Sequence, residues 1–323
     1  MKKFLFSILA VGAIVACTKS EVNYEDASEI SFAPVASTAT KAAIEGTIYP
    51  TNIPFNVFSF YAKDVEPGSV SDYTKFDVTY LNNKKFHNPN NSGIFSGSEH
   101  AYYWPKNGSL VFAGYSPCKD MIDSQAETYL LDEGLTITDY VQSNETQYTD
   151  DLMWFSQTKS SYRGIAVVPV KFIHACSWLS FYVTSATADA DFHIKKLVLN
   201  DVKVKGTFNS KIPTWTLASD EADVVVMNRD VPVDNSQIKV DDDGVIVLPQ
   251  SCVSATITYT MDNGAGVVVE QEQTFPLSAG TDGGVWKYAR HYTYTIKFSA
   301  DEILIAPAVN AWQEVGGTMV EAK

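Results

Sequence analysis

The chain has 323 residues, with 24 Lys and Arg against 38 Asp and Glu and a formal net charge of −14 at pH 7. A single hydrophobic core tends to stop growing near ~250–300 residues, so this length predicts two domains. The acidic balance argues against nucleic acid as a partner, because no stripe of Lys and Arg is present to neutralise phosphates.

The N-terminus has the pattern of an export signal. Met1-Lys2-Lys3 precedes an apolar run from Phe4 to Val15, which is shorter than the ~20 residues of a membrane-spanning helix. Ile14-Val15-Ala16-Cys17 resembles a bacterial lipobox, in which the chain is cut before the cysteine and the sulfur is acylated. We therefore expect cleavage between Ala16 and Cys17, fatty chains such as palmitate on Cys17, and anchoring in a Gram-negative outer membrane. An ordinary cleaved signal with a chance cysteine is the alternative.

Strand signals dominate from residue 50 onward, and amphipathic helical windows are scarce. The clearest strand is residues 291–298, where large apolar and aromatic residues alternate with polar ones. Asn82-Asn83 predicts a turn between strands 76–81 and 84–86, and residues 262–266 predict a turn after strand 254–261. Further strands are expected at residues 110–115, 135–137, 178–184, 194–199, 245–248 and 267–269, with one short helical turn at 149–154.

Many short strands with frequent turns predict an all-β fold of two β-sandwiches in series. We place the boundary in residues 157–164, which have the composition of a linker. The expected organisation is a signal peptide at 1–16, a lipidated tether at 17–41, an N-terminal sandwich at 42–163 and a C-terminal sandwich at 164–323.

Three cysteines remain after Cys17, namely Cys118, Cys176 and Cys252. Their number is odd and no CxxC spacing occurs, which argues against a zinc site. One disulfide with a leftover thiol suits an oxidising envelope. We favour buried free thiols, because Cys176 and Cys252 lie in or beside apolar stretches.

His174 and Cys176 form the pair that most suggests nucleophilic catalysis, since a thiolate needs an adjacent base. No third residue that would orient the histidine is evident in the sequence. We interpret His174 as a core or hydrogen-bonded histidine.

Three other motifs resemble sites but have simpler interpretations. Residues 241–244 offer carboxylates to calcium, yet they lack the rest of an EF-hand loop and match a common turn. Asp150 and Asp151 are adjacent, so they cannot flank a sugar as glycosidase carboxylates do. Residues 263–266 are rich in glycine, but no helix follows to bind a phosphate. We predict no enzyme, no metal site and no cofactor.

Aromatic residues are plentiful at Tyr102-Tyr103-Trp104-Pro105 and Trp154-Phe155. Exposed aromatic rings can stack on sugars, whereas buried rings contribute most to a sandwich core. We favour the core. A monomeric surface lipoprotein that binds glycans through these rings is the alternative function.

Several segments occur along the chain in a fairly specific order, although each motif is loose alone. They are residues 102–105 with 110–117, 151–153 with 170–174 and 179–183, 247–250, 286–296, and 309–312. Together they resemble the fimbrillin-like family, and the resemblance covers nearly the whole mature chain.

The resemblance implies two transthyretin-like β-sandwiches and a lipoprotein precursor of a type V pilus subunit, either a shaft or an accessory member. It implies removal of an N-terminal segment by a trypsin-like protease at the outer membrane. It also implies that a strand from a neighbouring subunit then fills the groove that this removal opens. The expected partners are other pilus subunits in a head-to-tail homo- or hetero-polymer, with a host or bacterial surface ligand.

The residues near the N-terminus support this view physically. Residues 28–34 form a short strand candidate, and the small polar residues 37–43 suit an exposed loop that a protease can cut. Removing the strand would unbury Ile30 and Phe32, at about 1.5–3 kcal/mol for each large apolar side chain. A strand from another chain would restore both the packing and the backbone pairing.

The position that matches the family's cleavage site is Lys41, followed by Ala42, whereas the family's cut often follows Arg.

The donor-strand candidates are residues 302–306 and 312–323, which are equally well interpreted as the last strands of the second sandwich. We predict a fimbrial subunit or adhesin precursor, lipid-anchored at the outer membrane and assembled into a surface fimbrium by donor-strand exchange.

Overall fold

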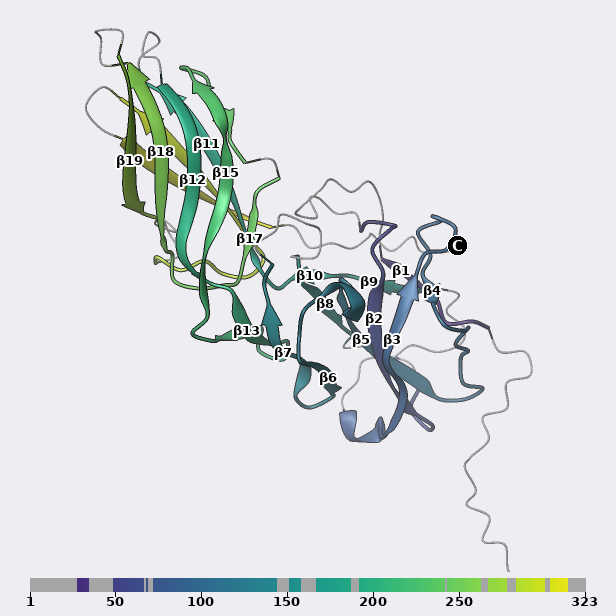
Figure 1. Ribbon diagram of the computed structural model, residues 1–323. Helices are drawn as coiled ribbons and strands as arrows, with labels where there is room; N and C mark the ends of the chain where they lie inside the picture. Colours follow the sequence, from purple (N-terminus) through teal and green to yellow (C-terminus); the bar gives the residue numbers. More distant parts are fainter. Residues whose placement is uncertain are drawn as a thin grey trace, which may run out of the picture.

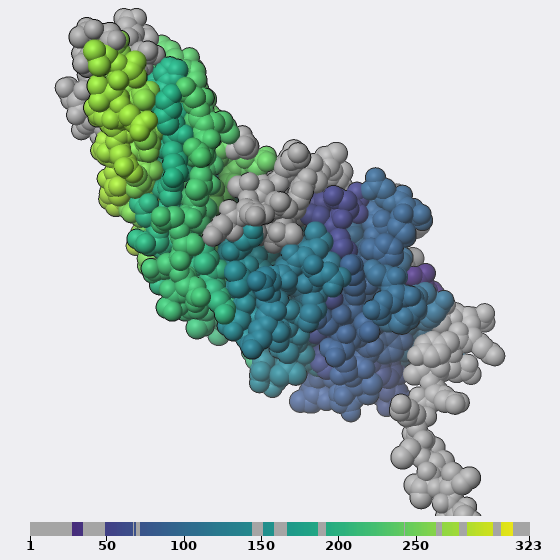
Figure 2. Space-filling model, viewed as in Figure 1, coloured from purple at the N-terminus to yellow at the C-terminus, as the bar shows by residue number. Residues whose placement is uncertain are grey.

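The computed structural model describes residues 28–34, 49–66, 68, 72–143, 151–157, 167–186, 192–241, 243–262, 267–277, 283–299 and 303–312. Its strands form two β-sheet bodies placed end to end, which gives the molecule an elongated shape (Figures 1 and 2). The predicted all-β fold with two sandwiches is confirmed. The helices found in these residues are the short 3-10 turns η1 (Tyr73–Lys75) and η2 (Lys119–Met121), and none is long and apolar enough to cross a membrane.

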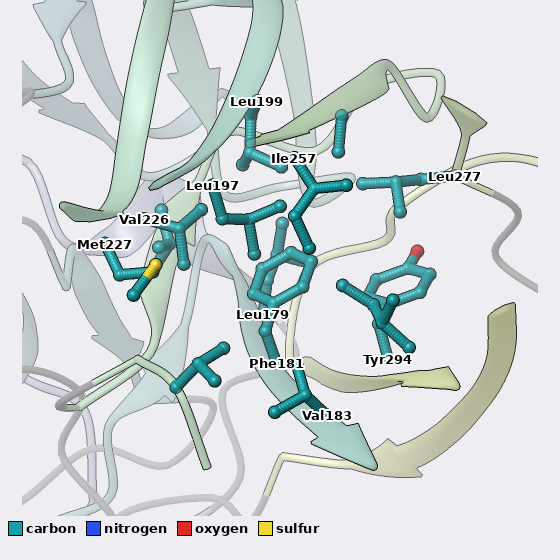
Figure 3. Close-up of a cluster of buried hydrophobic side chains, with 14 of the residues drawn as sticks. Leu179, Phe181, Val183, Leu197, Leu199, Val226, Met227, Ile257, Leu277 and Tyr294 are labelled. Carbon is teal, nitrogen blue, oxygen red and sulfur yellow. The ribbon is translucent and has the colours of Figure 1, made fainter. Parts of the chain in front are cut away.

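The C-terminal body is a sandwich of a five-stranded and a four-stranded sheet. Leu179 and Phe181 of one sheet meet Leu197 and Ile257 of the other in a buried core (Figure 3). The alternation predicted for residues 291–298 is confirmed, because every second side chain of β20 points into this core. The first sheet contains β11 (Ser177–Ser185), β16 (Ile238–Lys239), β17 (Val245–Val247), β20 (Arg290–Phe298) and β21 (Ile303–Ala311), and the second contains β12 (Phe192–Lys203), β15 (Glu221–Val233), β18 (Ser254–Asp262) and β19 (Val268–Pro276).

The N-terminal body is built on a six-stranded sheet with an apolar cluster on each face. Its strand β5 is buried at every position, as expected for a strand covered on both sides, and the sequence of β5 is accordingly almost continuously apolar. A two-stranded sheet of β1 (Phe32–Pro34) and β9 (Val168–Val170) contributes to one of the clusters. The order of the six strands is β10 (Ile173–His174), β8 (Met153–Ser156), β5 (Ser109–Ser116), β2 (Phe55–Ala62), β3 (Val78–His87) and β4 (Ser96–Gly97).

A further four-stranded sheet joins the two halves of the chain. Its order is β14 (Thr214–Leu217), β13 (Lys205–Asn209), β7 (Gly134–Val141) and β6 (Ala126–Leu130). The chain therefore crosses between the halves here, because β13 follows β12 almost directly yet pairs with β7. The predicted division at residues 163 and 164 stays a prediction, and most of its linker lies outside the described residues.

The hairpin predicted at Asn82-Asn83 is wrong, because β3 runs through both residues as one strand. Asn83 adopts a left-handed φ of 51° where the register of β2 and β3 shifts. Asparagine tolerates this conformation at a bulge as well as in a turn. Its side-chain amide donates to Glu127 at 3.0 Å and accepts from the Tyr115 hydroxyl at 3.0 Å, which fixes the bulge.

The short helical turn predicted at residues 149–154 is wrong in its described part. Met153–Ser156 is strand β8, and it pairs with the end of β5. Trp154 lies opposite Tyr115 in this pairing. Pairing with a distant strand therefore determines the structure of this segment.

Trp178 lies where the two bodies meet, with its indole N–H donating to the carbonyl oxygen of Asp243 at 3.1 Å. Gly244 follows with a φ of +83°, and a Cβ added there would lie 2.0 Å from the indole nitrogen and 2.7 Å from the Leu179 carbonyl oxygen. Gly283 has a similar φ of +73°, but a Cβ added there would meet nothing within 4 Å.

We predict that Gly244→Ala destabilises the protein more than Gly283→Ala. Both changes carry the strain of a left-handed residue, about 1–2 kcal/mol, and only the first adds an overpacking cost of about 1–3 kcal/mol. Urea unfolding of both variants measures the difference. Equal free energies of unfolding would show that the contact of Gly244 with Trp178 is unimportant.

His291 is the stacking partner of Trp178, with ring centroids 3.6 Å apart. Its Nε2 atom lies 3.0 Å from the Ser180 hydroxyl. Burial, and secondarily the charge of Lys239, lower the pKa of His291 from 6.5 to about 4. Between these values the unfolded chain binds a proton that the folded protein does not, so the stability falls as the pH drops from about 6.5 to about 4.

We predict that His291→Gln reduces this loss of stability, because glutamine can still bond Ser180 but does not titrate. The measurement is the free energy of unfolding of both proteins at pH 7, 5.5 and 4. The variant is less stable than the wild type at pH 7, since it lacks the ring stack, but its decline with acid is smaller. Parallel pH profiles would contradict the prediction.

Candidate functional site

The leading segment, residues 28–34, is an extended stretch that ends in strand β1 and is held on both of its edges. On one edge, the backbone N–H groups of Ile30 and Phe32 donate to the carbonyl oxygens of Tyr102 and Phe95 at 2.6 and 2.9 Å. On the other edge, β1 runs parallel to β9, and the N–H of Val168 donates to the Ser31 carbonyl oxygen at 2.8 Å. The segment thus lies between two neighbours that are distant from it in sequence.

The side chain of Phe32 anchors the segment. Phe32 and Ile30 are both fully buried. The Phe32 ring makes edge-on contacts with Phe86 and Phe112, with centroids 4.8 and 5.2 Å apart, and Phe55 lies at 6.0 Å. Aromatic pairs favour this T-shaped geometry, so the slot is matched in shape and in electrostatics to a phenylalanine.

Withdrawal of the leading segment would leave a groove that is both apolar and unpaired. Burying two large apolar side chains is worth about 1.5–3 kcal/mol each before any reorganisation. The backbone groups of residues 95–104 and of β9 would also lose their partners, at a cost for each group that stays buried. The emptied groove would favour any extended segment that supplies an apolar side chain at the position of Phe32.

Tyr49 is the next described residue after the leading segment, and it is anchored in the core. Tyr49 is fully buried, and its hydroxyl donates to the Ile53 carbonyl oxygen and lies 2.7 Å from the Ser116 hydroxyl. Burial raises the pKa of the Tyr49 hydroxyl well above its usual value. The predicted processing residues Lys41 and Ala42 lie between these two anchors, outside the described residues, as do Ala16 and Cys17. The roles expected for these four residues stay predictions.

The C-terminal donor candidate is a strand of the second sandwich in this structure. β21 pairs with β20 along its whole length and ends the five-stranded sheet. Trp312 follows directly, is 4% exposed, and stacks on His174 with ring centroids 3.7 Å apart. The interpretation of the C-terminal run as the last strand of the second sandwich therefore describes this structure. Residues 313–323 lie outside the described residues.

The interpretation of His174 as a buried, hydrogen-bonded residue is confirmed. Its Nδ1 atom lies 2.9 Å from Asp151 Oδ1, and both side chains are fully buried. Cys176 points its thiol toward Gln142 at 3.8 Å. None of Cys118, Cys176 and Cys252 is in a disulfide. Cys118 and Cys176 are buried, as expected, and Cys252 is half-buried.

Asp241 has a structural role in the second sandwich. Its carboxylate accepts from the Phe181 backbone N–H and lies 3.2 Å from Lys239 Nζ. Burial raises the pKa of Asp241, partly offset by these contacts. Within the described residues, no group of three or more His, Cys, Asp and Glu side chains could hold a metal ion. Residues 263–266 lie outside them.

The aromatic residues considered for sugar stacking mostly belong to the core. Trp104, Trp154 and Phe155 are at most 8% exposed, and Tyr102 is half-buried. Tyr103 is 41% exposed. These side chains do not form a flat solvent-facing row. The structure therefore does not support a sugar-stacking surface built from them, which the alternative glycan-binding function requires.

Sequence reasoning missed the two partners of the leading segment. β9 contains only three residues, and residues 95–104 contribute isolated bridges instead of a strand. The sequence of β9 is Val-Pro-Val, and its two β-branched residues at a spacing of two, both buried in the structure, were the available signal.

Comparison with known proteins identifies the family. The sequence model of the fimbrillin-like family matches residues 51–312, so the chain belongs to that family. This is a structural family of adhesion and pilus proteins, in agreement with the prediction that the chain is not an enzyme. A search of curated protein sequences gives no match.

Solved structures share the fold at low sequence identity. A fimbrial protein from Bacteroides vulgatus is 12% identical, with a TM-score of 0.61 over 80% of this chain and 93% of its own. A candidate cell adhesion protein from Bacteroides uniformis is 16% identical, with a TM-score of 0.57 over 89% and 98% of the two chains. A third, a candidate cell adhesion protein from Bacteroides ovatus, is 14% identical, with a TM-score of 0.54 over 90% and 99%.

We predict that Phe32→Ala lowers the free energy of unfolding by about 3–5 kcal/mol, because the enclosed slot cannot collapse around the cavity. Glu29→Ala is the matched control, since Glu29 lies in the same segment with an exposed side chain and should change stability by no more than ~0.5 kcal/mol. Urea unfolding measures both. A small loss for Phe32→Ala would show that the leading segment contributes little to the fold.

Proposed function

We propose that this protein is a fimbrial subunit or adhesin precursor that assembles by donor-strand exchange. The observation that carries the proposal is the leading segment, whose buried phenylalanine and two paired edges are what an inserted strand would have. In the proposed precursor, Cys17 holds the chain at the outer membrane through its acyl groups, and the mature subunit forms part of a surface fimbrium.

The proposed assembly step begins with cleavage after Lys41. Cleavage separates residues 28–34 from the rest of the subunit, so the segment can leave without unfolding either sandwich. The open groove then accepts a strand from another subunit by β-augmentation, which restores the backbone pairs and refills the phenylalanine slot. Because the groove and the donor lie on different parts of the chain, the contact is head-to-tail and builds filaments.

The proposed donor is the C-terminal run. β21 ends its sheet, so its outer edge has no strand partner in that sheet. Its residues alternate, with Ile305, Pro307 and Val309 half-buried and Ala306 and Ala308 exposed. This period of two is what a groove with alternate pockets selects.

The lysine at position 41 sets the protease requirement. A protease that cuts only after Arg leaves Lys41 intact. A subunit that stays uncut keeps its leading segment and offers no groove, so it would suit an end of the fimbrium. A Lys-cutting protease would make the same chain suitable for a shaft.

We predict that a Lys-specific protease trims the N-terminus after Lys41 and yields oligomers that resist SDS. Mass spectrometry identifies the new N-terminus at Ala42, and electrophoresis without heating detects a ladder. Mass spectrometry of the uncut native protein reports the acyl groups on Cys17. Lys41→Ala is the control, and it should remain full-length and monomeric under the same digestion. A trimmed protein that stays monomeric would overturn the proposal.

A further inference from the structure

A groove of about 630 Å³ lies at the junction of the two bodies. Trp154 and Ile173 line it from the N-terminal body, and residues 287–290 with Trp312 line it from the C-terminal body. Small-molecule sites in proteins commonly have volumes of ~300–1,000 Å³ and lie between domains. The groove is separate from the leading segment, because Trp154 belongs to the apolar cluster on the other face of the six-stranded sheet.

The charge of this groove is opposite to that of the protein. Its described lining contains the cations Lys287 and Arg290 and no Asp or Glu, although the chain as a whole has a net charge of −14. Both cations are in exposed positions on adjoining parts of the lining. A carboxylate suits such a site, because an arginine can bind both of its oxygens.

The same groove has aromatic walls. Trp154 and Trp312 are nearly buried, whereas Tyr288 is 37% exposed and offers the accessible ring. Aromatic faces suit a ligand that is apolar on one side and rich in hydroxyl groups, as a sugar ring is.

The wall formed by residues 287–290 is held in a fixed geometry. Ala289 has a left-handed φ of 53°, which is uncommon for a residue with a Cβ. Two backbone bonds hold it there, from its own N–H to the Cys176 carbonyl oxygen at 2.9 Å and from the Trp312 N–H to its carbonyl oxygen at 3.0 Å. Strained residues that the surroundings hold in place cluster at ligand sites.

We propose that this groove binds an acidic sugar, with Arg290 and Lys287 on the carboxylate and Tyr288 against the pyranose ring. The cations alone would suit any anion, but the aromatic walls and the volume favour a carbohydrate over a small inorganic ion. The site is independent of the proposed strand exchange. Hexuronic acids and sialic acids share the required chemistry, a carboxylate on a six-membered sugar ring.

The test is isothermal titration of the full chain with trigalacturonate, 3′-sialyllactose, neutral lactose and hexaglutamate. We expect at least one acidic sugar to bind at least about tenfold more tightly than lactose and hexaglutamate, and more weakly as salt rises. Preference for trigalacturonate indicates uronic polysaccharides as the source, and preference for sialyllactose indicates sialylated glycans. Arg290→Ala and Tyr288→Ala should each weaken the binding by roughly tenfold.

Lys297→Ala is the matched control, because Lys297 is an exposed cation at the other end of the same strand, β20. Its removal should change the affinity by less than about twofold. The proposal fails if neither acidic sugar binds, if lactose or hexaglutamate binds as tightly, or if Arg290→Ala has no more effect than Lys297→Ala. It also fails if binding appears only after deletion of residues 313–323, which would assign the groove to the chain's own C-terminal segment.

Discussion

The burial of one phenylalanine organises the N-terminal body. Phe32 reaches the core from a segment that precedes the sandwich in sequence, and its ring fills a slot made by Phe86, Phe112 and Phe55. A core of this size is close-packed, so the slot cannot shrink to nothing when the ring leaves. The fold therefore requires an occupant for the slot but does not require that the occupant belong to the same chain. The proposed strand exchange would use this difference.

The junction between the bodies is a second constraint. The sheet containing β7 and β13 takes strands from both halves of the chain, and the stack of His174 on Trp312 ties the last described residue to the first body. The hydrogen bond to Asp151 orients the His174 ring in this stack. Trp312 thus lies beside the groove lined by Arg290 and Tyr288, whereas the leading segment packs against the opposite face of the six-stranded sheet.

Local sequence patterns predicted most of the strands. They did not predict which distant segments pair with one another. Residues 291–298 were predictable because their period of two is present in the sequence itself, whichever strands lie beside them. The conformation at Asn83 was not predictable, because asparagine suits a turn and a bulge equally well and only the side chains of Glu127 and Tyr115 decide between them. The burial of Ile30 and Phe32 was predicted together with the strand candidate at residues 28–34. The partners of these residues in β9 and in residues 95–104 were not, since no local signal specifies which distant segment lies alongside.

Strand β8 shows how one short sequence serves two surfaces. Met153 and Phe155 point into the cluster that contains Phe32, and Trp154 between them points into the cluster beside the groove. Successive side chains of a strand alternate between the two faces, so a shift of one residue would exchange these environments. The pairing of Trp154 with Tyr115 and of Met153 with Ser116 fixes the register. Because the two faces are separated by the sheet itself, a strand could be replaced on one face while the groove on the other keeps its shape.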